Sequence, residues 1–461
     1  MTNSQEITKL LVLSLVWLTL IFGAVWLVSW GVGILLPGLL DTPAMGDVGH
    51  RTAELLRALT PIIAVLVFIP INAMFMVLFE RRSLALFTVR KGPNRVFHDG
   101  WLQTAADAVK LLFKEDITPR GADALMFTLA PIIFFAPSIF GALPLLAAVT
   151  NNHELFRVVN LPTGIFYVLA AASIPVVALV MAGWASNNKY SLVGGLRSAA
   201  QAISYEIPLV LSIVTVCLLA GTLDVVDIAK QQAGGILNWN LFGGGALAGL
   251  DQIIMAWRAG APGEDIANIF NQYYPHGPLS IIAAFLLIGC TIILMGLYLT
   301  GACAEINRIP FDLPEAESEL VSGYNTEYSG IKFAIFFLAE FTNLFIVSSI
   351  ATVMFLGGGD NPLPKWIISL FPMEQINNTF AMVFAPLISG AHFVDPATFW
   401  AALWVIAKVY GLVFFAILVR GTLPRFRIDQ LMDFGWKRLI PLSLLTFVLV
   451  VFLRVWVVCH G

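Results

Sequence analysis

The residues of this sequence that could carry chemistry are concentrated in one acidic stretch, positions 305–340. The chain has 29 acidic residues in 461, so an average window of this length would hold about two, whereas this one holds seven. Long apolar runs flank the stretch on both sides. Acidic groups at membrane depth usually mark proton or ion pathways, or polar partners. The seven carboxylates are Glu305, Asp312, Glu315, Glu317, Glu319, Glu327 and Glu340.

Part of this stretch fits an ordinary solvated loop that leads into a helix. Pro310 and Pro314 frame a helix start, because proline suits the first turn, where its missing N–H costs nothing. The positive end of such a helix stabilises nearby carboxylates, here Asp312, Glu315 and Glu317. This explanation covers about three of the seven carboxylates.

The remaining acids favour a buried or functional role. Glu315 and Glu319 are four residues apart on one helix face, and they repel each other when both are ionised. Glu340 lies inside the apolar run AIFFLAEFTNLFIV, where solvation in a loop cannot explain it. Glu206 sits at the mouth of another apolar run, so it should pair with a polar group or face water. Both hypotheses stay open for Glu206: placement inside the bundle, or solvation at the membrane interface.

The overall composition is that of a membrane protein. Hydrophobic residues make up 58% of the chain and charged residues 12%, whereas soluble domains carry roughly 25% charge. The net charge of −3 shows no nucleic-acid footprint. The four cysteines form no metal-binding spacing, and the six histidines fall in connections or at the C-terminus. We therefore expect a chain without a metal site, haem or redox centre of its own.

The apolar runs predict an all-α fold, a polytopic transmembrane helix bundle. Crossing a bilayer takes about 20 mostly apolar residues. The first run is too long for a signal-peptide core and is interpreted as an anchor. The predicted spans are residues 7–36, 59–79, 124–149, 164–185, 207–223, 279–304, 333–356, 399–419 and 439–459.

The distribution of Lys and Arg predicts the orientation of the bundle. Alternate connections carry 17 basic residues on one side and 7 on the other. The positive-inside rule places the richer side in the cytoplasm. The acidic stretch then lies on the inner side, with the N-terminus inside and the C-terminus outside. The long connections 224–278 and 357–398 fall on the outer side.

Two inner connections carry further signals. Residues 101–114 have helical spacing with an apolar face and a polar face, which predicts a helix along the membrane surface. A surface helix packed on its own bundle would have the same pattern. The next inner connection holds Arg197 among small residues such as Gly194 and Gly195, which allow membrane helices to approach closely.

Five segments on the predicted inner side resemble one known family. They read ERRSLALFTVRKGPNRV, LQTAADAVKLLFKED, GWASNNKYSLVGGLRSAAQAISYE, FDLPEAESELVSGYNTEYSG and LPRFRIDQLMDFGWK. In this order they resemble the quinone-chamber membrane subunit of respiratory complex I, the proton-pumping NADH:quinone oxidoreductase. The resemblance covers most of residues 58–461. Residues 1–57 look like an added span and outer loop, and residues 243–275 and 361–396 look like outer-side insertions.

The resemblance implies an enzyme subunit of a translocase in the bacterial inner membrane. Such a subunit forms part of a chamber for a quinone, expected to be ubiquinone. NADH, FMN and iron–sulfur clusters belong to partner subunits of the peripheral arm, and antiporter-like membrane subunits are further partners. The matching acids of the proton path are Glu80, Glu206, Asp312, Glu315, Glu317, Glu319, Glu327 and Glu340. The matching positions at the chamber and the junction between subunits are Arg81, Arg82, Arg90, Arg95, Asp107, Lys110 and Arg197.

Three other classes of protein remain alternatives at this stage. The equivalent subunit of a membrane-bound hydrogenase-type complex would share these motifs, although the ERR…GPNRV loop favours a quinone enzyme. A secondary transporter would be expected to contain repeats and broken helices at the midplane. A purely structural anchor would not need Glu340 inside a span.

The first span generates a topological prediction. Residues 7–36 should cross the membrane and place Met1 inside, because span 59–79 must deliver Glu80 to the inner face. A reporter fused at Met1 should therefore respond only to reagents on the cytoplasmic side. A reporter that responds only from outside would contradict this topology and indicate a hairpin or an interfacial helix.

Overall fold

The computed structural model describes residues 14, 17, 32, 36–37, 46–97, 100–150, 161–259, 262–273, 278–312, 322–364 and 396–460. In these ranges all regular elements are helical, as the predicted fold class requires. The long helices are α3 (Gly46–Phe87), α5 (Ala124–Thr150), α7 (Gly164–Ala185), α8 (Lys189–Ala220), α12 (Pro278–Glu305), α14 (Gly330–Phe355), α17 (Pro396–Thr422) and α19 (Ile440–His460). The shorter helices are α4 (Gln103–Leu112), α9 (Val225–Gln231), α10 (Ala248–Arg258), α11 (Gly263–Tyr273) and α18 (Ile428–Phe434). Single turns are η3 (Ile236–Asn238), η4 (Asn240–Phe242), η5 (Gly323–Asn325) and the π-helical η8 (Gly435–Leu439).

Eight helices in the described ranges are long and apolar enough to cross a membrane. They coincide with the predicted spans from 59–79 onward, so this part of the sequence prediction is confirmed. Almost all of the first predicted span, 7–36, lies outside the described residues. The predicted helix at 101–114 is present as α4, somewhat shorter than expected.

One predicted boundary is wrong. The span expected to begin at residue 207 belongs to α8, which begins at Lys189, so the expected connection around Arg197 is helical. Asn188 caps the helix by accepting a hydrogen bond of 3.0 Å from the Tyr190 amide. The prediction placed the helix start where the apolar run begins, whereas the helix extends through the small residues before that run, as their close packing allows. Arg197 and Glu206 therefore lie on one continuous helix.

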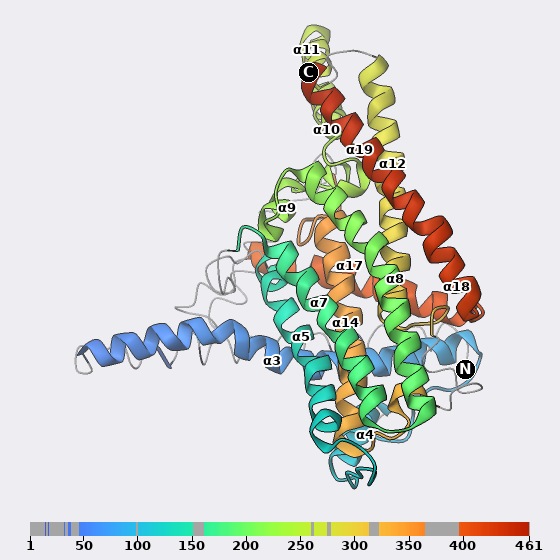
Figure 1. The fold of residues 1–461 in the computed structure, drawn as a ribbon. Helices are drawn as coiled ribbons and strands as arrows, with labels where there is room; N and C mark the ends of the chain where they lie inside the picture. The colour runs from blue at the N-terminus through green and yellow to red at the C-terminus, as the bar shows by residue number, and fades with distance from the viewer. Residues whose placement is uncertain are drawn as a thin grey trace.

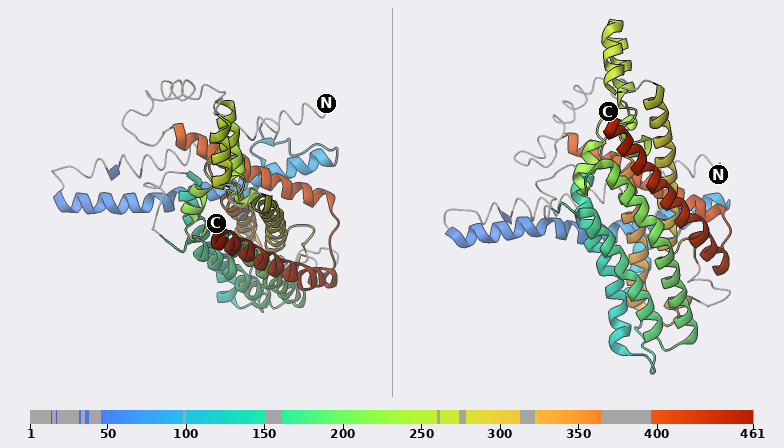
Figure 2. Two further views of the ribbon diagram at one scale, coloured as in Figure 1. Left: turned by 90° about the horizontal axis from the view of Figure 1, so that it is seen from above. Right: turned by 45° about the horizontal axis from the view of Figure 1, so that its top comes forward.

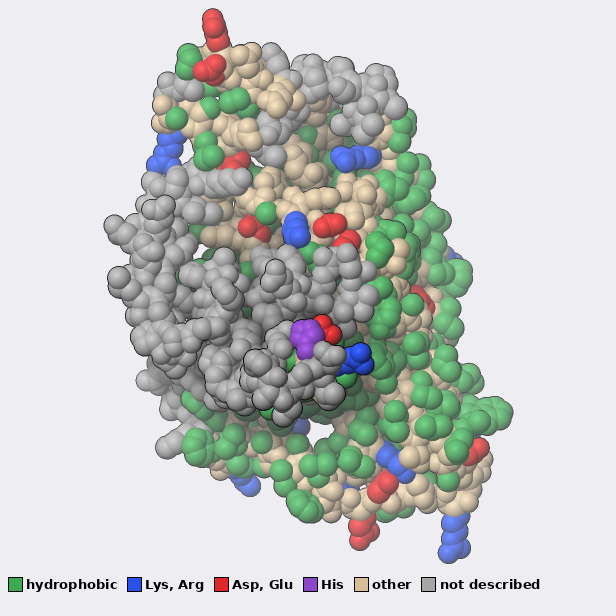
Figure 3. Space-filling model, turned by 90° about the vertical axis from the view of Figure 1, so that its left-hand side faces the viewer, with side chains coloured by type: hydrophobic (Ala, Val, Ile, Leu, Met, Phe, Trp, Pro, Cys, Tyr) green, Lys and Arg blue, Asp and Glu red, His purple; other side chains and the backbone are tan. Residues whose placement is uncertain are grey.

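The helices form one bundle, in which α3 and α17 run across the other helices (Figures 1 and 2). Helices α5, α7 and α8 pack side by side, and α14 packs against α5 and α17. Helices α12 and α19 lean across α8. The N-terminal half of α3 projects away from the bundle, and Leu55 and Leu66 are exposed along it. In Figure 3, hydrophobic side chains cover most of the right-hand side of the molecule, as expected of a lipid-facing surface.

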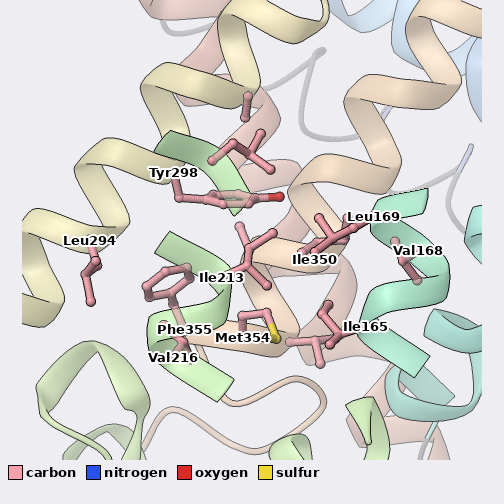
Figure 4. Packing of buried hydrophobic residues seen from close by; sticks show 14 of the residues in the cluster. Ile165, Val168, Leu169, Ile213, Val216, Leu294, Tyr298, Ile350, Met354 and Phe355 are labelled. Atoms are coloured by element: carbon pink, nitrogen blue, oxygen red, sulfur yellow. The ribbon is translucent and has the colours of Figure 1, made fainter. Parts of the chain in front are cut away.

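The largest core joins α7, α8, α12 and α14 (Figure 4). Its aliphatic side chains surround two tyrosines that are fully buried, Tyr205 and Tyr298. A buried hydroxyl needs a partner, and each tyrosine donates to a backbone carbonyl at 2.8 Å, that of Leu431 and that of Val347 respectively. These bonds fix the position of α18 and α14 against the core.

Two parts of the described structure lie outside this core. On α4, Leu102, Val109 and Leu112 are exposed although Thr104 is buried, so its apolar side points away from the bundle. On the predicted insertion 243–275, helices α10 and α11 pack on each other beyond the main bundle. The predicted insertion 361–396 lies mostly outside the described residues.

The contact between α8 and η5 generates a packing prediction. A Cβ atom on Gly194 would lie 2.7 Å from the Gly323 Cα atom, where backbone cannot give way. Gly194→Ala should therefore destabilise the protein by about 1–3 kcal/mol through overpacking. The measurement is the thermal unfolding midpoint of the purified protein in detergent. Gly296→Ala is the matched control, because that Cβ atom would meet open space; equal midpoints for the two variants would contradict the prediction.

Candidate functional site

A buried charged cluster lies where α3, α17 and the segment after α12 meet. Glu80, at 5% exposure, accepts two hydrogen bonds of 3.0 and 2.9 Å from Arg308 Nη1, and it also pairs with Arg420. Arg308 is itself buried, and its guanidinium group lies over the Phe341 ring at 4.3 Å. A buried carboxylate requires this kind of compensation, because its hydration has been lost.

A second acid of the predicted stretch is held in the same way. Asp312 is 5% exposed, and its Oδ2 atom pairs with Arg425 Nη2 at 3.0 Å. Gln201 on α8 fixes the same segment, since its Nε2 atom donates to the carbonyls of Ala304 and Phe311 at 2.7 and 2.6 Å. The predicted acids Glu80 and Asp312 are thus both buried and both paired with arginine.

The next feature is a cavity of about 60 Å³ inside the bundle. Its walls are mostly apolar and come from α5, α7, α8, α12 and α14. One buried water needs roughly 10–15 Å³ and two to four polar partners, so there is room for several. The polar side chains that line it are Ser138, Tyr298, Glu305, Asn307, Glu340 and Asn343.

Glu340 has the position that its place in an apolar run predicts. It lies in the middle of α14, lines the cavity, and its Oε1 atom accepts a hydrogen bond of 2.8 Å from the Tyr324 hydroxyl. Three residues later on the same helix face, the Asn343 Oδ1 atom accepts a bond of 2.5 Å from Ser138. Helix α14 therefore presents two adjacent polar groups to an otherwise apolar space.

Glu206 and Glu305 bring a second pair of acids to this region. Glu206 accepts a hydrogen bond from the Ser173 hydroxyl of α7. Glu305 ends α12, lines the cavity and lies close enough to Glu206 for their charges to interact. Of the two hypotheses for Glu206, the structure supports placement inside the bundle.

Glu327 lies at the edge of the acidic region, next to the turn between α7 and α8. Its Oε1 atom accepts a hydrogen bond of 2.7 Å from Asn188 Nδ2. The adjacent Tyr328 is buried, stacks on Phe127 at 4.1 Å between ring centroids, and packs edge-on to Phe336. Burial raises the pKa of the Tyr328 phenol, which keeps it neutral. Glu315, Glu317 and Glu319 lie outside the described residues.

The predicted basic residues do not form one cluster. Arg81 pairs with Asp107 of α4 at 2.6 Å, which ties the end of α3 to that helix. Arg82 and Arg197 are half-buried, whereas Arg90, Arg95 and Lys110 are exposed on this end of the molecule. The predicted basic residues are thus distributed between a paired, a half-buried and an exposed group.

Sequence reasoning does not find every residue of the site. It counts Glu305 in the acidic stretch without giving it a role, and it does not single out Ser138, Tyr324 and Asn343. Glu305 ends an apolar run as Glu206 begins one, and Asn343 follows Glu340 at helical spacing, so these two leave a readable signal. Ser138 and Tyr324 have no local signal, because only tertiary packing brings Ser138 to the cavity and Tyr324 to Glu340. In the described part of the chain, no group of three or more metal-ligating side chains is placed to hold a metal ion.

Comparison with known proteins points to one family. The family model described as NADH dehydrogenase matches residues 60–451. The H subunit of the NADH-quinone oxidoreductase of Dehalococcoides mccartyi (strain CBDB1) is 38% identical over 387 residues. That alignment covers 84% of this chain and 83% of the relative.

The Glu80 pair generates a prediction about stability. Arg308→Gln removes one partner of a buried carboxylate, and such changes cost about 3–5 kcal/mol. The unfolding midpoint in detergent should fall markedly, and Glu80→Gln in the same chain should restore part of the loss. Lys437→Met is the control, since its pair with Asp433 is solvent-exposed and contributes at most about 1 kcal/mol. Equal midpoints for Arg308→Gln and Lys437→Met would refute the assignment.

Proposed function

The chain belongs to the NADH dehydrogenase family, and on that basis we propose that it is the quinone-chamber membrane subunit of a proton-translocating NADH:quinone oxidoreductase. The eight long apolar helices in the described part of the chain suit a membrane subunit. In this role the chain forms part of the quinone chamber and carries the acids that couple quinone reduction to proton movement. The electrons come from NADH through FMN and iron–sulfur clusters in partner subunits. We place the chain in a bacterial inner membrane, with the acidic end facing the cytoplasm.

The observation that carries the proposal is a cavity inside the apolar bundle that is lined by two carboxylates. Glu305 and Glu340 line it, and Glu206 lies within electrostatic reach of Glu305. Several waters in this space can connect the carboxylates by short hydrogen-bonded steps. A purely structural bundle would gain stability from apolar side chains at these positions.

The chemistry of the three acids suits proton transfer. Two carboxylates that interact cannot both be ionised without mutual repulsion, so a proton arriving at one favours release from the other. Glu206 and Glu340 accept hydrogen bonds from the Ser173 and Tyr324 hydroxyls, which can rotate to donate elsewhere. Glu80 and Asp312 are instead paired with arginines. We assign to these pairs the role of setting the electrostatic potential at the acidic end of the bundle.

Entry of the quinone is proposed along α4 and the end of α3. A quinone tail is long and apolar, so it must enter sideways from the bilayer. The outward apolar side of α4, with Val109 and Leu112, supports contact with lipid at this point. The exposed Arg90 and Arg95 nearby suit contact with the peripheral arm, because arginine makes bidentate pairs with carboxylates.

The test replaces cavity acids one at a time in the assembled complex. Glu206→Gln, Glu305→Gln and Glu340→Gln keep the side-chain shape and remove the exchangeable charge. Each should lower proton translocation and coupled quinone reduction in vesicles several-fold, while NADH oxidation with an artificial acceptor continues. Glu264→Gln, an exposed acid on α11, is the matched control and should behave as wild type.

Wild-type proton translocation in all three cavity variants would refute the proposed path. Equal loss of quinone reduction and artificial-acceptor activity would indicate failed assembly of the peripheral arm rather than a role in coupling. Mass spectrometry of the co-purifying subunits accompanies the activity measurements and identifies the complex.

A further inference from the structure

A half-buried lysine occupies the end of the bundle remote from the acids that line the cavity. Lys408 lies on α17, within a helix apolar enough to cross a membrane. At 1.5 Å per residue it is about 18 Å along α17 from Arg420, which belongs to the Glu80 cluster. Ionisable residues inside spans are costly and usually functional. The acid network does not use this lysine, so its presence needs a separate explanation.

The ammonium group of Lys408 is fully engaged. Its Nζ atom donates to the backbone carbonyls of Leu356, Gly358 and Asp360 at 2.7, 3.0 and 2.7 Å. An ammonium has three N–H donors and no acceptor, so all three hydrogens are used. The charge also lies over the Trp239 ring at 4.3 Å.

These contacts seal the C-terminal end of α14. The last carbonyls of a helix have no intrahelical partner and carry partial negative charge. Gln232 donates to the Val353 carbonyl at 2.8 Å, and Asn240 donates to that of Met354 at 2.8 Å. Lys408 donates to the carbonyls that follow, beginning with that of Leu356. The nearby Asp360 carboxylate accepts from the Gly234 and Gly235 amides at 2.8 and 2.9 Å.

The position of this charge relates directly to the cavity. Helix α14 lines the cavity as far as Ile350. The Leu356 carbonyl held by Lys408 is six residues further along, which corresponds to about 9 Å of helical rise. Lys408 therefore lies beyond the cavity along α14, on the side away from Glu80.

We propose that Lys408 is a proton barrier, which closes the path through this chain at the end opposite the acids. This inference rests on the proposed function. A fixed positive charge in a low-dielectric bundle repels an approaching proton. Its three hydrogens are bound to backbone carbonyls, which are too weakly basic to accept a proton, so in this geometry the ammonium has no base to pass its proton to. The waters of the cavity therefore communicate with one side of the membrane only.

The test measures passive proton entry in the absence of NADH and quinone. The intact complex is reconstituted in vesicles that contain a pH-sensitive dye, the membrane potential is clamped with potassium and valinomycin, and an external acid pulse is applied. Lys408→Met removes the charge and should raise passive proton conductance several-fold. Lys408→Arg retains the charge and should stay near the wild-type rate.

A second pair of variants tests the charge without changing Lys408. Asn240→Asp and Asn240→Leu both remove the bond to the Met354 carbonyl, so they disturb the α14 end similarly. Only Asn240→Asp adds a negative charge. Asn240 follows Trp239, whose ring contacts the Lys408 ammonium. We expect a raised passive proton conductance in vesicles with Asn240→Asp and a wild-type conductance in vesicles with Asn240→Leu. This pair of variants decides the question if Lys408→Met does not assemble.

Two results would overturn the barrier. Tight vesicles with both Lys408→Met and Asn240→Asp would show that the charge blocks nothing. Leakage from Asn240→Leu and Lys408→Arg equal to that of the charge-changing variants would mean that helix packing matters rather than charge. Because the assay involves no turnover, its outcome is distinguishable from failure of the Glu→Gln test of coupling.

Discussion

The structure depends on compensating charge inside an apolar bundle. Glu80 is 5% exposed, and its partners Arg308 and Arg420 come from positions far apart in the chain. Because an unpaired buried charge is far more costly than the pair, these three side chains also determine how their segments pack. The end of α3, the segment after α12 and the end of α17 are held together by one carboxylate. The pair of Asp312 with Arg425 extends the same junction.

The polar groups of the bundle fall into two physical types. Glu80 and Asp312 are held by arginines, which fixes both their charge and their orientation. Glu206, Glu305 and Glu340 belong instead to a region with hydroxyls, an amide and space for water. The partners named for Glu206 and Glu340 are hydroxyls, whereas Glu80 and Asp312 are each paired with arginine. On the proposed function, this contrast separates acids that shape the site from acids that exchange protons.

Helix α14 links the two ends of the molecule. It carries Glu340 and Asn343 at the cavity, and its C-terminal carbonyls are held by Gln232, Asn240 and Lys408. A displacement of its capped end would therefore shift the polar groups that line the cavity. The positive charge of Lys408 is stabilised by the same carbonyls that it caps at the end of α14.

The sequence by itself determined the fold class, eight of the helices and the unusual place of Glu340. Apolar run length and an acid within such a run are local properties, and bilayer thickness makes them decisive. It placed the start of α8 too late, because an apolar run marks the membrane-crossing part of a helix and not the polar turns that precede it. Only the tertiary structure decided that Arg308 and Arg420 share Glu80, that Ser138 reaches the cavity, that Tyr324 bonds to Glu340, and that Lys408 closes the end of α14. Those contacts join residues 16 to 340 positions apart, and no local pattern encodes which of these side chains meet.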